Sequence, residues 1–131
     1  MKLKVRENNT NPAPFHDGMH EEEVRLHFEC GHCGNGFDED LLSSLDKGED
    51  WFRSLTESDQ RSIAKGFGYK YEIVGPNKIP YVRFKNGNMA YFVNLPCPKC
   101  NTLSLVAVEF YEKQPARYIA SLMAAAEVEA K

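Results

Sequence analysis

The chain has 131 residues, 42% of them hydrophobic and 27% charged, which predicts one folded domain. No apolar run approaches the ~20 residues that a membrane-spanning helix needs, so we expect no membrane association. The first fifteen residues lack the apolar core of a secretory signal, which favours a cytoplasmic protein in a reducing compartment.

Charge is distributed unevenly along the chain. The formal net charge is −3, yet residues 17–60 contain thirteen acidic and three basic side chains, whereas residues 61–100 contain seven basic and one acidic. If these segments lie apart, the protein presents opposite potentials on two faces, which favours oriented docking on a charged partner. If they lie side by side, they neutralise one another, and the sequence does not distinguish the two arrangements.

The first third of the chain predicts an arm, a strand and a short helix. Residues 1–20 are rich in Pro, Asn and Thr, which is typical of a poorly ordered arm, and residues 21–131 form the predicted domain. Apolar and polar residues alternate over 23–29, which indicates a half-buried strand. A short helix should follow, with Asp38, Glu39 and Asp40 in its first turn and a stop at Lys47-Gly48.

A second short helix and a series of strands are expected next. Thr56 and Asp59 resemble a capping box and predict a helix over residues 57–66. Alternating and β-branched residues predict strands over 69–74, 79–85, 89–95 and 102–111. The Asn86-Gly87 pair is a hairpin signal between the second and third of these strands.

The last segment predicts a C-terminal helix. Pro115 suits a first helical position, and Ile119, Leu122, Met123 and Ala126 form one helical stripe. The charges at its two ends are the reverse of what a helix dipole prefers, so packing would have to stabilise it.

Four cysteines form two Cys-x-x-Cys pairs that are far apart in the sequence. The first pair is Cys30 and Cys33, in Cys-Gly-His-Cys-Gly, and the second is Cys97 and Cys100, in Cys-Pro-Lys-Cys-Asn. Each pair can present two thiolates from one tight turn, and two such turns together supply the four soft donors of a tetrahedral zinc site. In a reducing compartment, metal ligation is a better explanation of these cysteines than disulfides.

These motifs resemble the zinc-ribbon class of rubredoxin-like proteins, in which two cysteine knuckles on β-hairpins hold one metal ion. The resemblance covers the two knuckles and their flanking strands. Residues 34–96 separate the knuckles, a much longer insertion than a minimal ribbon contains. The resemblance implies one structural Zn²⁺. Since four cysteine ligands leave no open coordination position, we do not expect the metal to be catalytic.

Other interpretations of the cysteines stay open. Iron could occupy the same four-sulfur site, as in a rubredoxin-like electron carrier. Cys30 and Cys33 could form a redox pair, although a turn rather than a helix follows them, and the four thiols could also be free and buried. His32 lies inside the first knuckle, and we expect its side chain to point away from the metal.

The sequence offers no catalytic set, so we expect a protein that is not an enzyme. Ser43 and Ser44 have no nearby His and Asp partners, and no phosphate loop or nucleophile elbow is present. The acidic residues are candidate contacts for a protein partner, although the first three could instead bind a cation or cap a helix. They are Asp38, Glu39, Asp40, Glu49 and Asp50.

The fold that we predict is a single α+β domain, an antiparallel sheet with a four-cysteine zinc-ribbon site, two short inserted helices and a C-terminal helix. The expected function is recognition of a protein partner, such as a bacterial toxin-immunity role or an adaptor or regulatory role. The alternative is nucleic-acid binding by the basic, aromatic segment 69–99. Its candidate residues are Lys70, Tyr81, Arg83, Lys85 and Lys99.

Overall fold

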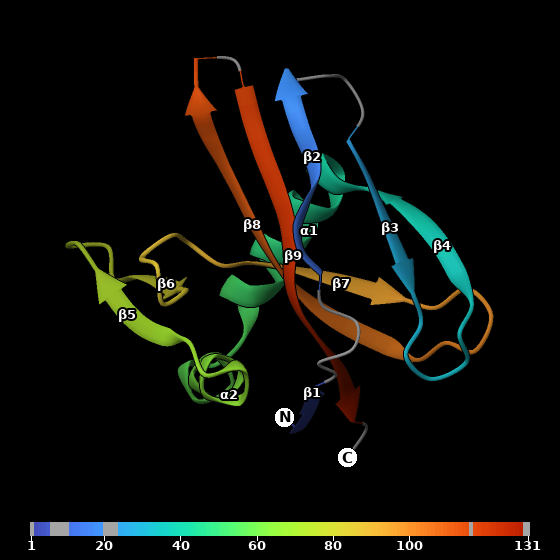
Figure 1. Cartoon of the computed structure of the whole chain (residues 1–131). Coiled ribbons are helices and arrows are strands. Elements are labelled where there is room, and N and C mark those ends of the chain that lie inside the picture. The colour runs from blue at the N-terminus through green and yellow to red at the C-terminus, as the bar shows by residue number, and fades with distance from the viewer. Residues whose placement is uncertain (1, 6–10, 20–23, 116, 130–131) are drawn as a thin grey trace.

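The computed structural model describes residues 2–5, 11–19, 24–115 and 117–129. This part of the chain is a mixed α+β protein, built mainly from antiparallel strands with two helices (Figure 1). The predicted α+β class is therefore confirmed, whereas the predicted C-terminal helix is wrong.

One antiparallel sheet forms the centre of the protein. Its strands follow the order β1–β9–β8–β7, and β2 also pairs with β9. Because β8 occupies one edge of β9, β1 and β2 share the other edge, one after the other. The strands are β1 (Lys2–Val5), β2 (Asn11–Met19), β7 (Tyr91–Pro96), β8 (Leu103–Gln114) and β9 (Arg117–Glu129).

Both faces of this sheet are buried. The middle of β8 sends Val106 and Val108 into one core and Leu105 and Ala107 into the other, and all four are fully buried. The first core lies under the hairpin of β3 (Arg25–Glu29) and β4 (Gly36–Asp40). The second core lies under α2 (Glu57–Phe67) and the hairpin of β5 (Lys70–Val74) and β6 (Ile79–Arg83).

The helix α1 (Leu41–Ser54) runs against the edge strand β7 and contributes to both cores. Its first residue, Leu41, belongs to the first core, and Phe52 belongs to the second. Gly48 allows the close crossing, because a Cβ atom there would lie 1.8 Å from the carbonyl oxygen of Phe92. α1 therefore covers an edge of the sheet, where unpaired backbone groups would invite association with other chains.

The predicted limits of the first helix are wrong at both ends. Asp38, Glu39 and Asp40 lie on β4 instead of the first helical turn, and the helix continues through Gly48 to Ser54. Packing explains the continuation, since burial of Phe52 and the contact with β7 outweigh the poor helix propensity of glycine.

The second helix was predicted correctly. The Thr56 hydroxyl accepts a hydrogen bond from the Asp59 backbone, and Gly68 ends the helix with a φ of 79°. The Asn86-Gly87 turn also forms, but its flanking strands do not make a hairpin together. Instead, β6 pairs with β5, and β7 pairs with β8. Among the described residues, one isolated β-bridge, between Arg83 and Met89, connects the ends of β6 and β7.

The C-terminal segment is the long strand β9 instead of a helix. Apolar residues fill nearly every position from 119 to 126, so either periodicity fits, and pairing with β8, β1 and β2 decides for the strand. A bulge in β9 leaves Met123 without a partner on β8. Because of this extra residue, Met123 and Ala124 both face the second core, and Ala125 faces the first core again. A strand also avoids the unfavourable helix dipole.

The predicted poorly ordered arm contains β1 and β2, so the structure differs from the expectation over residues 2–5 and 11–19. Both strands gain backbone hydrogen bonds from β9, and the Arg117 guanidinium donates to the Asp17 carboxylate at 2.7 and 2.9 Å. The remaining residues of that arm, 1, 6–10 and 20, lie outside the described part of the chain.

Candidate metal centre

The two cysteine pairs lie in the turns of two β-hairpins. Cys30 and Cys33 occupy the turn between β3 and β4, and Cys97 and Cys100 occupy the turn between β7 and β8. The two turns meet at one end of the molecule, where the β3–β4 hairpin covers the first core (Figure 1). The flanking strands thus hold the knuckles as the sequence predicts.

The two knuckles have the same backbone hydrogen bonds. In the first, Cys30 N donates to Asn35 O at 2.9 Å and Gly34 N donates to Cys30 O at 2.8 Å. In the second, Cys97 N donates to Thr102 O at 3.0 Å and Asn101 N donates to Cys97 O at 2.9 Å.

A left-handed residue follows the second cysteine of each knuckle. Gly34 has a φ of 78° and Asn101 has a φ of 64°. Glycine adopts this conformation at no steric cost, and asparagine tolerates it better than most residues. The two turns are therefore equivalent in backbone conformation, although their sequences share little beyond the cysteines.

The four sulfur atoms converge in space. All lie within 4.8 Å of one another, with Cys30 Sγ 3.7 Å from Cys100 Sγ and Cys33 Sγ 3.6 Å from Cys97 Sγ. A tetrahedral ion with zinc–sulfur bonds of roughly 2.3 Å places its sulfurs about 3.8 Å apart, whereas a disulfide needs about 2.05 Å. The spacing fits the corners of a metal site and does not fit disulfide bonds.

The site lies between the first core and the surface. Cys30 and Cys97 are buried, Cys100 is half-buried and Cys33 is exposed. Burial raises the pKa of Cys97, but hydrogen bonds from the backbone of Cys100 and Lys99 outweigh it, and the net shift is downward. The second knuckle thus donates backbone N–H groups to sulfur, which stabilises the thiolate that binds metal.

Thr102 contributes to the candidate metal centre, and the sequence analysis did not identify it. Its hydroxyl oxygen lies 3.2 Å from Cys100 Sγ, and this hydrogen bond, with that of its backbone, lowers the pKa of Cys100 to about 6. The signal in the sequence is a hydroxyl residue two positions after the last cysteine. A hydrogen bond from the Asn35 backbone lowers the pKa of Cys33, but partial loss of hydration and hydrogen bonds with the three other sulfurs raise it to about 11. Four thiolates this close together repel one another, and a bound cation would compensate for that repulsion.

His32 lies in the first knuckle but outside the cluster of sulfur atoms. Its side chain is exposed, and its Nδ1 lies 3.6 Å from a carboxylate oxygen of Glu127 on β9. Within the described residues, the four cysteines are the one cluster of three or more candidate metal ligands, and it does not include His32.

The predicted acidic contact residues lie on two elements and do not form a cluster of candidate ligands. The Asp38 carboxylate accepts a 2.7 Å hydrogen bond from His27 Nδ1 across the β3–β4 hairpin. Glu49 forms a 2.7 Å ion pair with Arg53 on α1. Asp50 is exposed on α1, while Glu39 and Asp40 are half-buried on β4.

The structure brings together three of the five predicted nucleic-acid contacts. Lys70, Arg83 and Lys85 line one hollow of about 480 Å³, in which Arg83 also pairs with Glu72. Tyr81 lines a different pocket, and Lys99 lies in the second knuckle.

The acidic segment, residues 17–60, and the basic segment, residues 61–100, are partly in contact, because α1 packs on β7 and the two knuckles meet. The β3–β4 hairpin and the β5–β6 hairpin lie on opposite sides of the molecule, with the central sheet and α1 between them (Figure 1). The structure therefore has elements of both arrangements, since the two hairpins lie apart while the acidic helix α1 lies against β7 of the basic segment.

Comparison with protein-family models, with curated proteins and with solved structures found no match. In the part of the chain that the structure describes, neither helix has the length and apolarity to cross a bilayer.

Proposed function

We propose that the four cysteines hold one structural Zn²⁺ and that the protein recognises a macromolecular partner without catalysing a reaction. The observation that carries this proposal is the convergence of four sulfur atoms at tetrahedral spacing. Four thiolates complete the coordination of zinc, so no position remains for water or substrate. The ion would join the β3–β4 hairpin to the central sheet.

Metal analysis of the purified protein tests the first half of the proposal. We expect about one zinc per chain and a colourless solution. A red preparation that contains iron would instead favour an electron carrier with the same four-sulfur ligands. A preparation that binds neither metal after reduction of its thiols would contradict a metal site.

We propose a protein as the partner, one that presents a basic face to the acidic surface of β4 and α1. Asp38, Glu49 and Asp50 are exposed there, while Glu39 and Asp40 are half-buried. Exposed charges of one sign favour fast, oriented association with a partner of opposite charge. An immunity protein that neutralises a basic nuclease would use such a surface, and so would a cytoplasmic adaptor or regulator.

Affinity capture from the native source tests the choice of partner. We expect a basic protein whose binding weakens as the salt concentration rises and is lost when Asp50→Lys is used as bait. A variant with the same charge change on the opposite hairpin, Glu72→Lys, provides the comparison. Equal capture by both variants would contradict the acidic surface as the binding face.

The basic hollow supports a second candidate, nucleic-acid binding. Lys70, Arg83 and Lys85 surround it, and no carboxylate is among its described lining residues. We expect Lys85→Glu to abolish any binding of single-stranded oligonucleotides, while Lys99→Glu, outside the hollow, has a smaller effect. Absence of binding at low salt would remove this candidate.

A further inference from the structure

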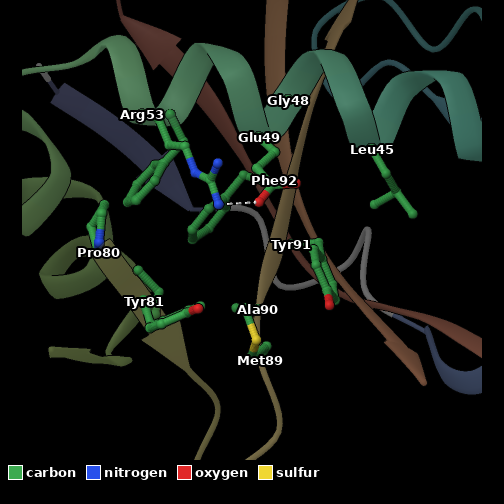
Figure 2. Close-up of a pocket in the computed structure, with 12 residues that line it drawn as sticks. Leu45, Gly48, Glu49, Arg53, Pro80, Tyr81, Met89, Ala90, Tyr91 and Phe92 are labelled. Atoms are coloured by element: carbon green, nitrogen blue, oxygen red, sulfur yellow. Dashed lines mark ion pairs between the residues drawn. The ribbon is translucent and has the colours of Figure 1, made fainter. Parts of the chain in front are cut away.

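A hollow lies where the end of β4, the first half of α1 and the edge strand β7 meet. α1 touches β7 at Gly48, which lies next to Phe92 (Figure 2). Ser44 is one helical turn before Gly48 and three residues before Lys47, so these side chains lie on neighbouring parts of one helix face. We call this space the β4–α1 hollow, and it is lined by Glu39, Ser44, Lys47, Gly48, Asn94 and Pro96.

Glu39 points toward the interior of the protein. β4 pairs with β3 so that Glu39 lies opposite Leu26 and Asp38 lies opposite His27. Directly opposed residues point to the same face of a hairpin, and Leu26 is fully buried in the first core. Glu39 is therefore directed inward and half-buried, whereas Asp38 is directed outward with the exposed His27. An inward carboxylate is costly unless a partner compensates for the water that it loses.

The hollow contains two opposite charges that are not paired. Within the described residues, the side chains of Glu39 and Lys47 form no hydrogen bond or ion pair, either with each other or with another group. The next pocket along α1 is different, because its Glu49 and Arg53 pair with each other at 2.7 Å, as the dashed line in Figure 2 marks. The β4–α1 hollow thus presents a carboxylate and an ammonium group to the same space.

These opposite charges select the class of ligand. Lys47 would repel a simple cation, and Glu39 would repel a simple anion. A small zwitterion satisfies both, because its ammonium group can donate to Glu39 while its carboxylate accepts from Lys47. Ser44 and Asn94 add a hydroxyl and an amide, which are neutral hydrogen-bonding groups.

The size of the hollow limits the ligand to a small molecule. Its volume is about 240 Å³. A single water needs roughly 10–15 Å³ of such space, so the hollow has room for a molecule of several heavy atoms. Lys47 and Pro96 are exposed, which leaves the hollow open to solvent on their side.

We infer that the β4–α1 hollow binds a free α-amino acid in its zwitterionic form. The inference goes beyond the proposed recognition of a protein, because neither activity requires the other. The ligand would contact β4, α1 and β7 together. Its binding would therefore add a link between the β3–β4 hairpin and the central sheet, besides the first core and the knuckles.

Titration of the purified protein with alanine tests the inference, with the backbone amide resonances as the readout. N-acetylalanine lacks the ammonium group and alaninamide lacks the carboxylate, so the two analogues test each charge separately. We expect alanine to shift the resonances of residues 39–48 and 94–95, and each analogue to bind at least about tenfold more weakly. The shifts should diminish with added salt, because Lys47 is exposed.

Two variants with matched controls locate the binding. Glu39→Gln removes the inward carboxylate and should weaken alanine binding about tenfold, while Asp38→Asn removes the neighbouring outward one and should leave it unchanged. Lys47→Gln should weaken binding about two- to fivefold, as expected for an exposed charge. Lys65→Gln removes an exposed lysine from α2 and should have no effect.

The outcomes separate this inference from the proposed function. Alanine shifts at the hollow, with both variants weakened and both controls unchanged, would support the inference. No shifts at millimolar alanine, or equal shifts with the two analogues, would overturn it. Shifts confined to residues 30–33 and 97–100 would show that alanine contacts the metal instead, which also overturns it. Metal analysis and partner capture use neither alanine nor these variants, so the proposed function stands or fails by itself.

Discussion

Thr102 serves the candidate metal centre in two ways. Its carbonyl oxygen accepts the hydrogen bond from Cys97 N that closes the second knuckle, and its hydroxyl lies 3.2 Å from Cys100 Sγ. The backbone contact fixes the shape of the turn and survives any substitution that keeps the chain conformation. Cys100 Sγ donates to the Thr102 hydroxyl while it holds its proton, and after deprotonation the hydroxyl can donate to the thiolate, which lowers the pKa of Cys100.

Replacing Thr102 with valine separates these two contributions. Thr102→Val keeps the shape and β-branching of the side chain but removes the donor, and we expect zinc affinity to fall by about 10- to 100-fold. Competition with a chromophoric chelator measures this change. Thr102→Ser keeps a hydroxyl and should retain most of the affinity. If the valine variant binds zinc as tightly as the unaltered protein, the hydroxyl does not support the site.

Gly48 is required by the contact between α1 and β7. A Cβ atom at this position would lie 1.8 Å from Phe92 O, a backbone atom that cannot move away without disturbing the sheet. We expect Gly48→Ala to lower the free energy of unfolding by about 1–3 kcal/mol or more, in spite of the better helix propensity of alanine. The midpoint of urea unfolding measures the effect.

Gly66 provides the matched control for this substitution. It also lies in a helix, but the atom nearest to an added Cβ is the flexible end of Leu3, at 3.2 Å. Gly66→Ala should therefore leave stability unchanged or raise it by up to about 1 kcal/mol. Similar effects of the two alanines would show that propensity, and not the contact with β7, governs both positions.

At the scale of elements, Gln60 joins α1, α2 and β5. Its side-chain amide donates to Phe52 O at 2.9 Å and to Leu55 O at 3.3 Å, which satisfies the end of α1. The Tyr71 hydroxyl on β5 donates to Gln60 Oε1 at 2.6 Å. A polar residue as buried as Gln60 is stable there because these partners compensate for lost water.

Removing the Tyr71 hydroxyl should weaken this junction. Tyr71→Phe leaves Gln60 Oε1 buried without its donor, so we expect a loss of about 1–3 kcal/mol in the free energy of unfolding, measured in urea. Tyr111→Phe removes a hydroxyl from an exposed tyrosine and is the control. Equal stability of the two variants would mean that water replaces the donor at Gln60.

The β5–β6 hairpin should lose stability in acid. The Arg83 guanidinium, which donates a hydrogen bond to Glu72, holds the pKa of that carboxyl below its usual value. Because the folded state has the lower pKa, the ion pair stabilises the protein above about pH 4.3 and stops doing so as the pH falls through the folded-state pKa.

Glu72→Gln tests this pH dependence. We expect the variant to be less stable than the unaltered protein at neutral pH, and the difference between them to shrink toward zero at about pH 2. Any loss of metal in acid lowers the stability of both proteins alike, so it cancels in the difference between them. The Arg83→Gln background is the control, since Glu72→Gln should change little there. A difference that does not vary with pH would contradict the ion pair as its cause.

Elements set by local chemistry were predictable, while those set by distant pairing were not. α2 has a hydroxyl cap at Thr56 and a left-handed glycine at Gly68, and its limits follow from those residues. β9 has no such markers, and its uniform apolar run satisfies both helical and strand periodicity. Its conformation depends on β8 and on β1 and β2 from the other end of the chain, which no local pattern reveals.

At the scale of the whole molecule, the candidate metal centre was predictable because the cysteines and their Cys-x-x-Cys spacing indicate it directly. Two Cys-x-x-Cys pairs favour a shared site whatever lies between them, so the long segment from 34 to 96 did not hide the convergence of the cysteines. The pocket beneath α1 that Tyr81 lines has no such signature. Its walls come from Phe52, Tyr81 and Tyr91, which share a space because β6 and β7 diverge under α1.

The proposed ion would join two layers of the protein, the β3–β4 hairpin and the central sheet. The β3–β4 hairpin contacts the central sheet through apolar residues of the first core, such as Leu26 and Phe28, and through the facing knuckles. α2 and the β5–β6 hairpin instead cover the second core, on the other face, and α1 contributes to both cores. Loss of the proposed ion should therefore release the β3–β4 hairpin first, because this hairpin is the element that the ion would join to the central sheet.

Cys97→Ser tests this role of the metal. We expect the variant to lose zinc, to unfold at a lower urea concentration, and to lose amide exchange protection on β3 and β4 before α2. His32→Ala alters the first knuckle without removing a sulfur, so it should keep one zinc per chain and its protection. Structural zinc can contribute on the order of 10 kcal/mol to folding, so the two variants should differ widely. If Cys97→Ser unfolds cooperatively at the original midpoint, the four sulfurs do not stabilise the fold through a shared ion.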